Sequence, residues 1–373
     1  MQVEFATEFL RCPSCRRDRT LTLRATASDA REVREGALEC GACGASFPLH
    51  RGVGQLMPDP PEHVAREAAG LARFADRMRD DGWNKELIRR LPLVDQGYWY
   101  VQARSMEQLL GTLRFRPGQW LLDVGSNTCW ASNHFAVRGL RVIALDISLT
   151  ELQGLYTSDY FIEDGTSYFE RVLGSMYDMP VASATLDYVY CCEVLHHNDA
   201  ATLRRTFEEA HRVLKPGGRM LIVNETIKTR HDPVGVHTEG VDIYEGYEHA
   251  FWASRYRWEA SRAGFLTRVL HPSYHEFFAE RPQQRPPLRR PWRRARFELR
   301  TSSTGRRAYL SWLNHVRGGV ALSMIATKPR LPAAASRALR RGVALSMIAT
   351  KPRLPDAAGR ALRRPRRPAG RCG

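Results

Sequence analysis

The sequence predicts an α/β protein in which a mostly parallel sheet carries helices on both faces, preceded by a small cysteine-rich β module. Two observations predict it. From residue 118 onward short apolar strands alternate with helical segments, and two Cys-x-x-Cys pairs stand near the N-terminus. The chain has 373 residues, 43% of them hydrophobic, which is enough for a large buried core.

The cysteine pairs come first along the chain. Four of the eight cysteines form Cys12-Pro-Ser-Cys15 and Cys40-Gly-Ala-Cys43, with 24 residues between the pairs. Two such knuckles supply four soft ligands for a tetrahedral Zn²⁺, so the spacing predicts a structural zinc site on these four cysteines. A redox pair and two disulfides are the alternatives, which paired knuckles in a cytoplasmic chain disfavour. We expect residues 1–57 to form a zinc-ribbon-like module with short strands at residues 20–24 and 45–49.

Residues 58–117 are expected to be a helical linker that covers the site of the next domain, because residues 64–78 and 100–113 show helical periodicity. The α/β domain is expected over residues 118–332. Its predicted strands span residues 120–124, 142–145, 171–173, 186–191, 219–224, 266–270 and 320–327, and its predicted helices span residues 130–138, 200–214 and 251–263. The segment Lys215-Pro216-Gly217-Gly218 is expected to stop the second of these helices.

Two of the predicted strands end in acidic residues. The first runs into Asp123-Val124-Gly125, and the second ends at Asp146, 23 residues after Asp123. A carboxylate at the end of the second strand can accept hydrogen bonds from both hydroxyls of an adenosine ribose. The first loop is not Gly-x-Gly-x-x-Gly and is not built to hold a pyrophosphate. The segment therefore favours an adenosine-like cofactor that is not a dinucleotide.

At this point the sequence resembles the class I S-adenosylmethionine-dependent methyltransferases, in particular those that act on small molecules. The resemblance spans residues 95–275 and a closing strand at 320–327, and it is carried by LLDVGSNT, VIALDIS, GSMYDMP, LDYVYCCEVLHH and RVLKPGGRMLIVNE in this order. It implies a Rossmann-like seven-stranded sheet whose last strand is antiparallel. CPSC and CGAC resemble the knuckles of the small zinc-binding domains that precede some methyltransferases.

The resemblance also implies which residues hold S-adenosylmethionine. Gly125 would let the backbone approach the methionyl part, Asp123 would hold its amino group, and Asp146 would bind the ribose. The full implied set is Asp123, Gly125, Ser126, Asn127, Asp146, Ile147, Ser175, Met176 and Glu193. The chain departs from the family where Asn127 replaces a glycine and where Ser175 replaces an acid beside the adenine.

Three histidines are the candidate catalytic residues. His196 and His197 follow the strand at residues 186–191 and so are expected beside the methyl group, and His249 ends a polar segment that begins at Glu225. A neutral imidazole is a suitable general base for a hydroxyl or ammonium acceptor. The alternative for each histidine is a helix cap or a packing role. The polar segment favours a polar acceptor, and its irregular spacing gives little support to a metal site.

The charge is unevenly distributed. Residues 281–373 hold 24 Lys and Arg against 2 Asp and Glu, whereas the rest of the chain is net acidic. This tail contains a repeat, since residues 319–341 and 342–364 agree at 21 of 23 positions. We expect the first copy to supply the closing strand, and residues 333–373 to be a disordered duplicated tail. No apolar run is long enough to span a membrane, and residues 1–10 do not look like a secretory signal, so a cytoplasmic location is expected.

Together these features predict an O- or N-methyltransferase for a small molecule in specialised metabolite biosynthesis. An RNA methyltransferase is the first alternative, favoured by the basic tail but disfavoured by the net acidic character of residues 1–280. The second is a zinc-scaffolded binding protein with a degenerate cofactor site. The sequence indicates neither the acceptor nor an oligomeric state.

Overall fold

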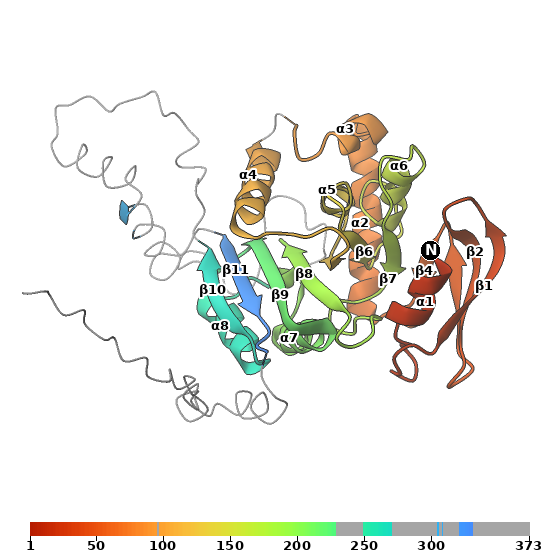
Figure 1. Cartoon of the computed structure of the whole chain (residues 1–373). Coiled ribbons are helices and arrows are strands. Elements are labelled where there is room, and N and C mark those ends of the chain that lie inside the picture. Colours follow the sequence, from red (N-terminus) through yellow and green to blue (C-terminus); the bar gives the residue numbers. More distant parts are fainter. Residues whose placement is uncertain (95–96, 229–248, 271–303, 306–307, 309–320, 331–373) are drawn as a thin grey trace, which may run out of the picture.

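One mixed sheet of eleven strands runs through the described part of the chain (Figure 1). The computed structural model describes residues 1–94, 97–228, 249–270, 304–305, 308 and 321–330. The strands are β1 (Leu21–Ser28), β2 (Val33–Cys40), β3 (Ser46–His50), β4 (Val53–Gln55), β5 (Trp120–Val124), β6 (Arg141–Asp146), β7 (Glu170–Leu173), β8 (Leu186–Cys192), β9 (Leu214–Glu225), β10 (Leu266–Leu270) and β11 (Leu322–Thr327). The helices are α1 (Val3–Phe9), α2 (Glu62–Asp80), α3 (Lys85–Arg89), α4 (Gly97–Thr112), α5 (Trp130–Ala136), α6 (Asp159–Ile162), α7 (Ala200–Val213) and α8 (Ala253–Arg262), with 3₁₀ turns η1 (Leu155–Ser158) and η2 (Leu195–His197).

The strand order is β1-β2-β3-β4-β7-β6-β5-β8-β9-β11-β10. The five strands β7, β6, β5, β8 and β9 are parallel, and β11 is antiparallel to both β9 and β10. The last seven strands in this order are therefore the predicted seven-stranded sheet with an antiparallel strand inserted near one edge. The first copy of the repeat supplies that strand, β11, as the sequence predicted.

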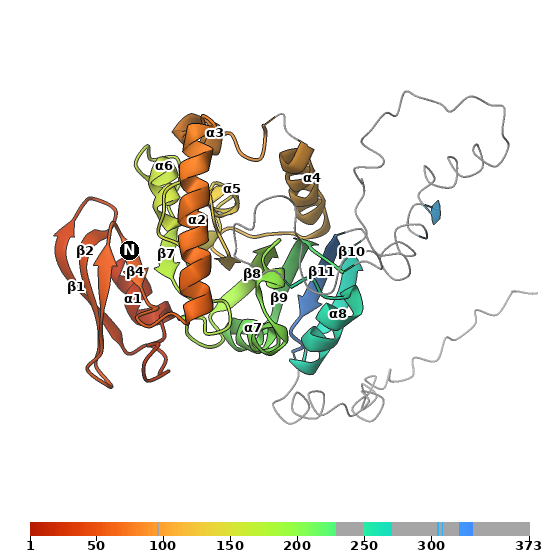
Figure 2. The same cartoon turned by 180° about the vertical axis from the view of Figure 1, so that it is seen from behind.

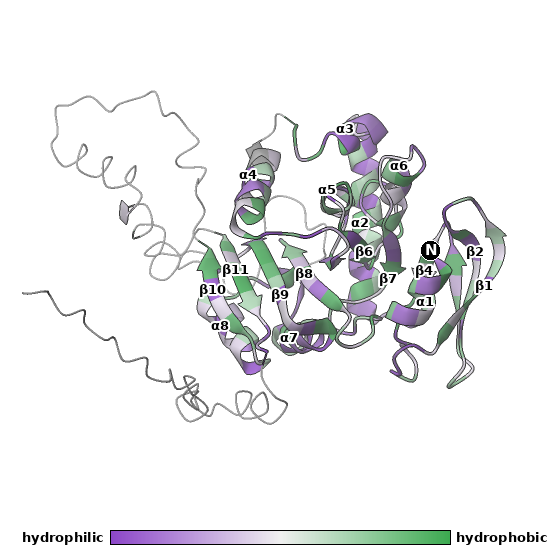
Figure 3. Cartoon of the chain, viewed as in Figure 1, coloured by the Kyte–Doolittle hydropathy of each residue, from purple (hydrophilic) through white to green (hydrophobic). Residues whose placement is uncertain are grey.

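Both faces of the central strands are covered, as their near-continuous apolar sequences require. Alternate residues of a strand point to opposite faces, so Leu122 of β5 packs in one core and Leu121 in the other. The first core includes Phe5 of α1, together with residues of α7 and α8. The second includes Phe135 of α5, together with residues of α2 and α4. Figure 3 shows apolar residues along β8, β9 and β11, and Figure 2 shows α2 from the opposite side.

The N-terminal strands continue the same sheet. The antiparallel pairs β1–β2 and β3–β4 form two hairpins, and β4 then pairs in parallel with β7 through Val53–Arg171, Gly54–Val172 and Gln55–Leu173. The sequence did not predict α1. Its Phe9 lies against the Trp120 ring, with ring centroids 4.1 Å apart, so this helix packs on the central sheet.

The Lys215-Pro216-Gly217-Gly218 segment ends α7 but also belongs to β9, which begins at Leu214. Gly217 adopts a φ of +86° and donates its N–H to the Lys328 carbonyl oxygen at 2.8 Å, which accommodates the irregular start of the strand. Among the described residues, none of the helices is both long and apolar enough to cross a bilayer.

Candidate functional site

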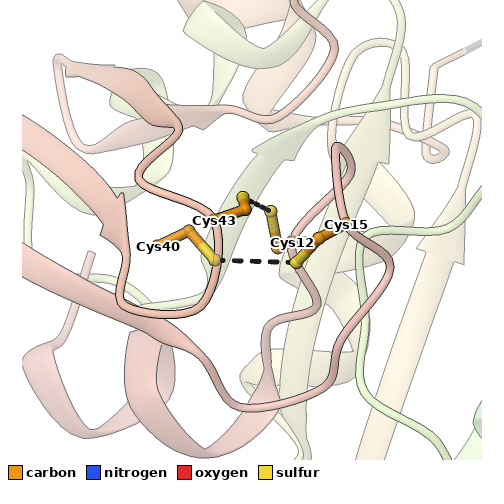
Figure 4. A group of neighbouring side chains, drawn as sticks. All are labelled: Cys12, Cys15, Cys40 and Cys43. Atoms are coloured by element: carbon orange, nitrogen blue, oxygen red, sulfur yellow. Dashed lines mark hydrogen bonds between the residues drawn. The ribbon is translucent and has the colours of Figure 1, made fainter.

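The four N-terminal cysteines converge (Figure 4). Their sulfur atoms all lie within 4.8 Å of one another. A tetrahedral Zn²⁺ with bonds of about 2.3 Å to four thiolates separates the sulfurs by about 3.8 Å, and the pairs Cys12–Cys43 and Cys15–Cys40 lie 3.8 Å and 3.7 Å apart. The donor set and its spacing therefore fit zinc.

The two knuckles fold alike. Arg16 donates its N–H to the Cys12 carbonyl oxygen, and Gly44 donates to that of Cys40, each at 2.9 Å. Arg16 and Gly44 are both left-handed, with φ of 56° and 76°. Each knuckle is thus a tight turn that brings its two sulfurs to one point.

The loop after β5 makes a close backbone turn. Gly125 has a φ of +68°, and a Cβ there would lie 2.4 Å from Val194 Cγ2, so only glycine fits. Asn127 and Cys129 stand where the family would have small residues and are left-handed, with φ of 46° and 56°. Asparagine tolerates this conformation better than most side chains. Asn127 therefore gives the backbone path that a glycine would give.

Asp146 ties the first two loops together. Its carboxylate accepts hydrogen bonds from the backbone N–H groups of Asn127 at 2.8 Å and Ser148 at 2.9 Å. Burial raises the pKa of Asp146 to about 6, despite these hydrogen bonds, and the nearby Glu67 charge adds to the increase. The carboxylate is thus buried at the carboxyl end of β6, where a ribose hydroxyl would find an acceptor.

Asp123 is also buried, and it points toward α5. Ser132 donates its hydroxyl to Asp123 Oδ2 at 2.6 Å. Burial raises the pKa of Asp123 to about 7, and the charge of Asp146 adds to this. The loop after β5 therefore lies between two carboxyl groups, Asp123 and Asp146, whose ionised forms are destabilised by burial. A ligand that carries positive charge would stabilise these ionised forms.

The remaining predicted cofactor residues follow the other parallel strands, and parallel strands bring their carboxyl ends to one edge of the sheet. Ser126 donates its N–H to the Leu145 carbonyl oxygen, and Ile147 follows Asp146 directly and is half-buried. Ser175, after β7, accepts from the Tyr177 N–H at 3.2 Å, and Met176 is half-buried beside it. Glu193, after β8, is left-handed with a φ of 48°.

Each of the two adjacent histidines faces a carboxylate. His196 Nδ1 lies 2.9 Å from Glu225 Oε1, and His197 Nδ1 lies 2.9 Å from Glu67 Oε1. The imidazole ring centroids are 4.3 Å apart. His249 contributes a backbone contact, since its N–H donates to the His196 carbonyl oxygen at 2.6 Å.

Sequence reasoning assigned no role to Glu225 or Glu67. Glu225 ends β9 much as Asp146 ends β6, and this was a readable signal. Glu67 lies on α2, and nothing local connects it with a histidine after β8.

Two buried polar atoms near this edge have no hydrogen-bond partner among the described residues: Gln102 Nε2 on α4 and Thr128 Oγ1 in the loop after β5. Unsatisfied buried donors are costly, so such atoms suit a polar ligand. With the glycine turn and the two acids, they fit S-adenosylmethionine. The other polar residues of the acceptor-side segment, from His231 to Glu248, lie outside the described residues, as does the tail from residue 333 onward.

Comparison with known proteins agrees with this geometry. Residues 122–222 match the profile of a family described as "Methyltransferase domain". The chain is 34% identical over 129 residues to the biotin biosynthesis bifunctional protein BioHC of Cellvibrio japonicus, covering 33% of this chain and 24% of that protein. It is 28% identical over 164 residues to 27-O-demethylrifamycin SV methyltransferase of Amycolatopsis mediterranei, covering 41% and 56%.

Among solved structures, phosphoethanolamine N-methyltransferase 2 of Haemonchus contortus, in complex with S-adenosyl-L-methionine, matches with a TM-score of 0.41 and 17% identity, covering 61% of this chain and 52% of that one. The chain thus spans about a quarter of BioHC and about half of the rifamycin enzyme.

Proposed function

The chain contains a class I S-adenosylmethionine-dependent methyltransferase domain, and on this premise we propose that the protein is an O- or N-methyltransferase for a small molecule in specialised metabolite biosynthesis. The rifamycin relative has such a role by name. The observation that carries the proposal is the joining of the loop after β5 to Asp146 by the Asn127 N–H. This hydrogen bond puts a glycine turn and a buried acid at one edge of the sheet.

We assign the predicted cofactor residues to this edge. Gly125 and Asn127 would line the methionyl side, Asp146 would accept from the ribose hydroxyls, and Ser175 with Met176 would flank the adenine. When bound, S-adenosylmethionine supplies an activated methyl group, so the protein chiefly aligns the acceptor and excludes water. Burial of Asp123 and Asp146 makes this edge favourable for a cationic ligand.

His196 is the proposed general base for a hydroxyl or ammonium acceptor. It follows β8 and is held by Glu225. His197 is paired with Glu67 of α2 and is assigned to holding that helix over the cofactor. His249 is assigned a supporting role, because its described contact is with the His196 backbone.

The zinc site is proposed to be structural. Four cysteine ligands complete a tetrahedron and leave no open position for chemistry. We further propose that the protein is cytoplasmic, because cysteines that bind zinc must stay reduced and the cytoplasm keeps thiols reduced.

Calorimetric titration of S-adenosylmethionine and S-adenosylhomocysteine into the zinc-loaded full chain tests the proposal. Wild type is expected to bind both, and Asp146→Ala is expected to weaken binding by at least about tenfold through loss of charge-assisted hydrogen bonds. Asp76→Ala is the matched control, because Asp76 lies exposed on α2 beside Arg79. Folded, zinc-loaded wild type that bound neither ligand would refute the proposal.

A further inference from the structure

Glu225 is fully buried at the end of β9 and has an unusual number of donors. Its two carboxylate oxygens accept from three successive backbone N–H groups, those of Val194 at 3.2 Å, Leu195 at 2.9 Å and His196 at 2.8 Å. The Tyr256 hydroxyl of α8 also lies close, 3.4 Å from Glu225 Oε1 and 3.0 Å from the Thr226 carbonyl oxygen. The carboxylate thus fixes the loop that carries both candidate histidines.

Glu225 is ionised at neutral pH. Burial alone would raise the pKa of Glu225, but the hydrogen bonds from the His196 ring and from the backbone of Leu195 and Val194 outweigh burial and lower it. An ionised carboxylate only accepts hydrogen bonds. The ring nitrogen that faces it at 2.9 Å, His196 Nδ1, must therefore carry a proton.

A neutral imidazole protonated at Nδ1 has its lone pair on Nε2. We propose that Glu225 is a positioning residue of the methyl-transfer site, which fixes the tautomer and ring orientation of His196 so that Nε2 is the nitrogen that takes the acceptor's proton. The inference rests on the proposed function for the proton transfer itself. In that transfer the acceptor's heteroatom would form its bond to the methyl carbon as the bond from that carbon to the sulfonium sulfur breaks, which leaves S-adenosylhomocysteine, and the acceptor's proton would pass to Nε2.

The Glu67–His197 pair has the same 2.9 Å separation but a different setting. Glu67 belongs to the covering helix α2, and among the described residues it pairs with the ring of His197. Glu225 instead binds the ring of His196 and the backbone of its loop. The two pairs can therefore be compared directly. Glu225 is part of strand β9 of the sheet, whereas Glu67 is part of helix α2, which packs over the sheet.

A purely structural role for Glu225, as a cap of η2, is the competing explanation, and the protonation state of the ring separates the two. The full chain, labelled with ¹⁵N in its histidines, would be observed at pH 8 by long-range ¹⁵N–¹H correlation, which distinguishes protonated from unprotonated ring nitrogens. His196→Asn identifies the His196 signals by their loss. Wild type is expected to show His196 protonated at Nδ1 alone.

Glu225→Gln is expected to lose this single tautomer, because an amide can either accept from or donate to Nδ1. Glu67→Gln is expected to change the His197 signals and leave those of His196 in place. Wild-type His196 carrying its proton on Nε2, or Glu225→Gln retaining only the Nδ1–H form, would overturn the inference. A wild-type His196 proton on Nε2 overturns the inference even if Glu225→Gln does not fold.

Titration of the same samples with S-adenosylmethionine separates this inference from the proposed function. Binding with the wrong tautomer would leave the methyltransferase proposal standing and reject the role of Glu225. The expected tautomer without cofactor binding would reject the methyltransferase proposal, and with it the assignment of His196 as a base.

Discussion

The centre of the described sheet and its N-terminal end are stabilised by different interactions. Around β5, β6 and β8, apolar side chains fill both faces, and polar groups occur where the strands end. Around β1 to β4, the apolar side chains join the core on one face of the central sheet, and four cysteines and a set of buried ion pairs also connect the strands. The comparison teaches that a small β module can extend a large sheet when its apolar side chains share the core of that sheet and a cysteine cluster and paired charges connect its strands.

The first zinc knuckle lies against the segment that follows the adenine-side residues. Arg11 donates its N–H to the Pro180 carbonyl oxygen at 3.1 Å, and Arg16 forms an ion pair with Asp178 at 2.9 Å. Asp18 accepts from the Ser183 N–H at 3.0 Å. The module therefore contacts the polypeptide that carries Ser175 and Met176, and its folding can affect the cofactor site.

Loss of zinc is expected to have the largest effect. Zinc binding in small structural domains is worth about 10–16 kcal/mol, so its removal should unfold the module. Cys12→Ser is expected to abolish one bound zinc per chain, measured by elemental analysis, and to lower the thermal midpoint measured by circular dichroism. It should also weaken S-adenosylmethionine binding by about tenfold or more, because residues 178–183 lose their partners.

Cys192→Ser is the control for that experiment. Cys192 lies outside the cluster and contacts Gln102 Oε1 at 3.0 Å, which a serine hydroxyl can also do. It should keep zinc and cofactor binding. A Cys12→Ser protein with unchanged metal content and thermal midpoint would disprove the metal site.

The buried ion pair at the junction is the next target. Arg171 of β7 donates to both carboxylate oxygens of Glu32, each at 2.7 Å, and both side chains are fully buried. Glu32→Gln should lower the free energy of unfolding by about 3–5 kcal/mol, because it leaves a buried guanidinium without its counter-charge. Urea unfolding of the full chain measures this.

Glu39→Gln is the matched control, since the Glu39–Arg24 pair lies exposed on β2 and β1 and should be worth less than about 1 kcal/mol. The stabilisation by Glu32 should also depend on pH. Burial opposes ionisation, but Arg171 and the Met1 ammonium together outweigh it and lower the pKa of Glu32 to about 2 from its usual 4.5. The stabilisation is therefore complete above pH 4.5 and lost as the pH falls toward 2. Equal effects of the two substitutions would contradict this account of the junction.

The fold of the central domain was predictable because its signals are local. Apolar runs bounded by turns identified the five parallel strands β5 to β9, and the knuckle spacing identified the cysteine cluster. Three features were not predictable. The pairing of β4 with β7 depends on residues far apart in sequence, α1 forms against Trp120, and β9 continues through a proline and two glycines because Lys328 supports its start.

The site shows the same division. Asp123, Gly125 and Asp146 were found because one short loop and two strand ends carry them. Glu225 and Glu67 were missed because their roles arise from histidines that only the folded chain brings near. Whether the predicted residues bind cofactor stays a prediction for calorimetry, while the structure places them along one edge of the sheet.

The last prediction concerns the central region and the pH dependence of stability that Asp123 causes. Burial there destabilises the ionised carboxylate of Asp123. Burial raises the pKa of Asp123 from its usual 3.8 to about 7, so the folded protein binds a proton that the unfolded chain has released between these values. Stability should therefore fall as the pH rises from about 4 to about 7. This direction is opposite to that expected from Glu32.

Asp123→Asn cannot ionise, yet it keeps an oxygen that can accept from Ser132. Its unfolding free energy should match that of wild type near pH 4 and exceed it by about 4 kcal/mol at pH 8, in the absence of cofactor. Urea unfolding at both pH values measures the difference, with Asp76→Asn as an exposed control. If both variants follow the wild-type pH dependence, burial does not destabilise the Asp123 carboxylate. If Asp123→Asn is more stable but binds S-adenosylmethionine more weakly, the buried Asp123 carboxylate lowers the stability of the free protein and contributes to binding of the ligand.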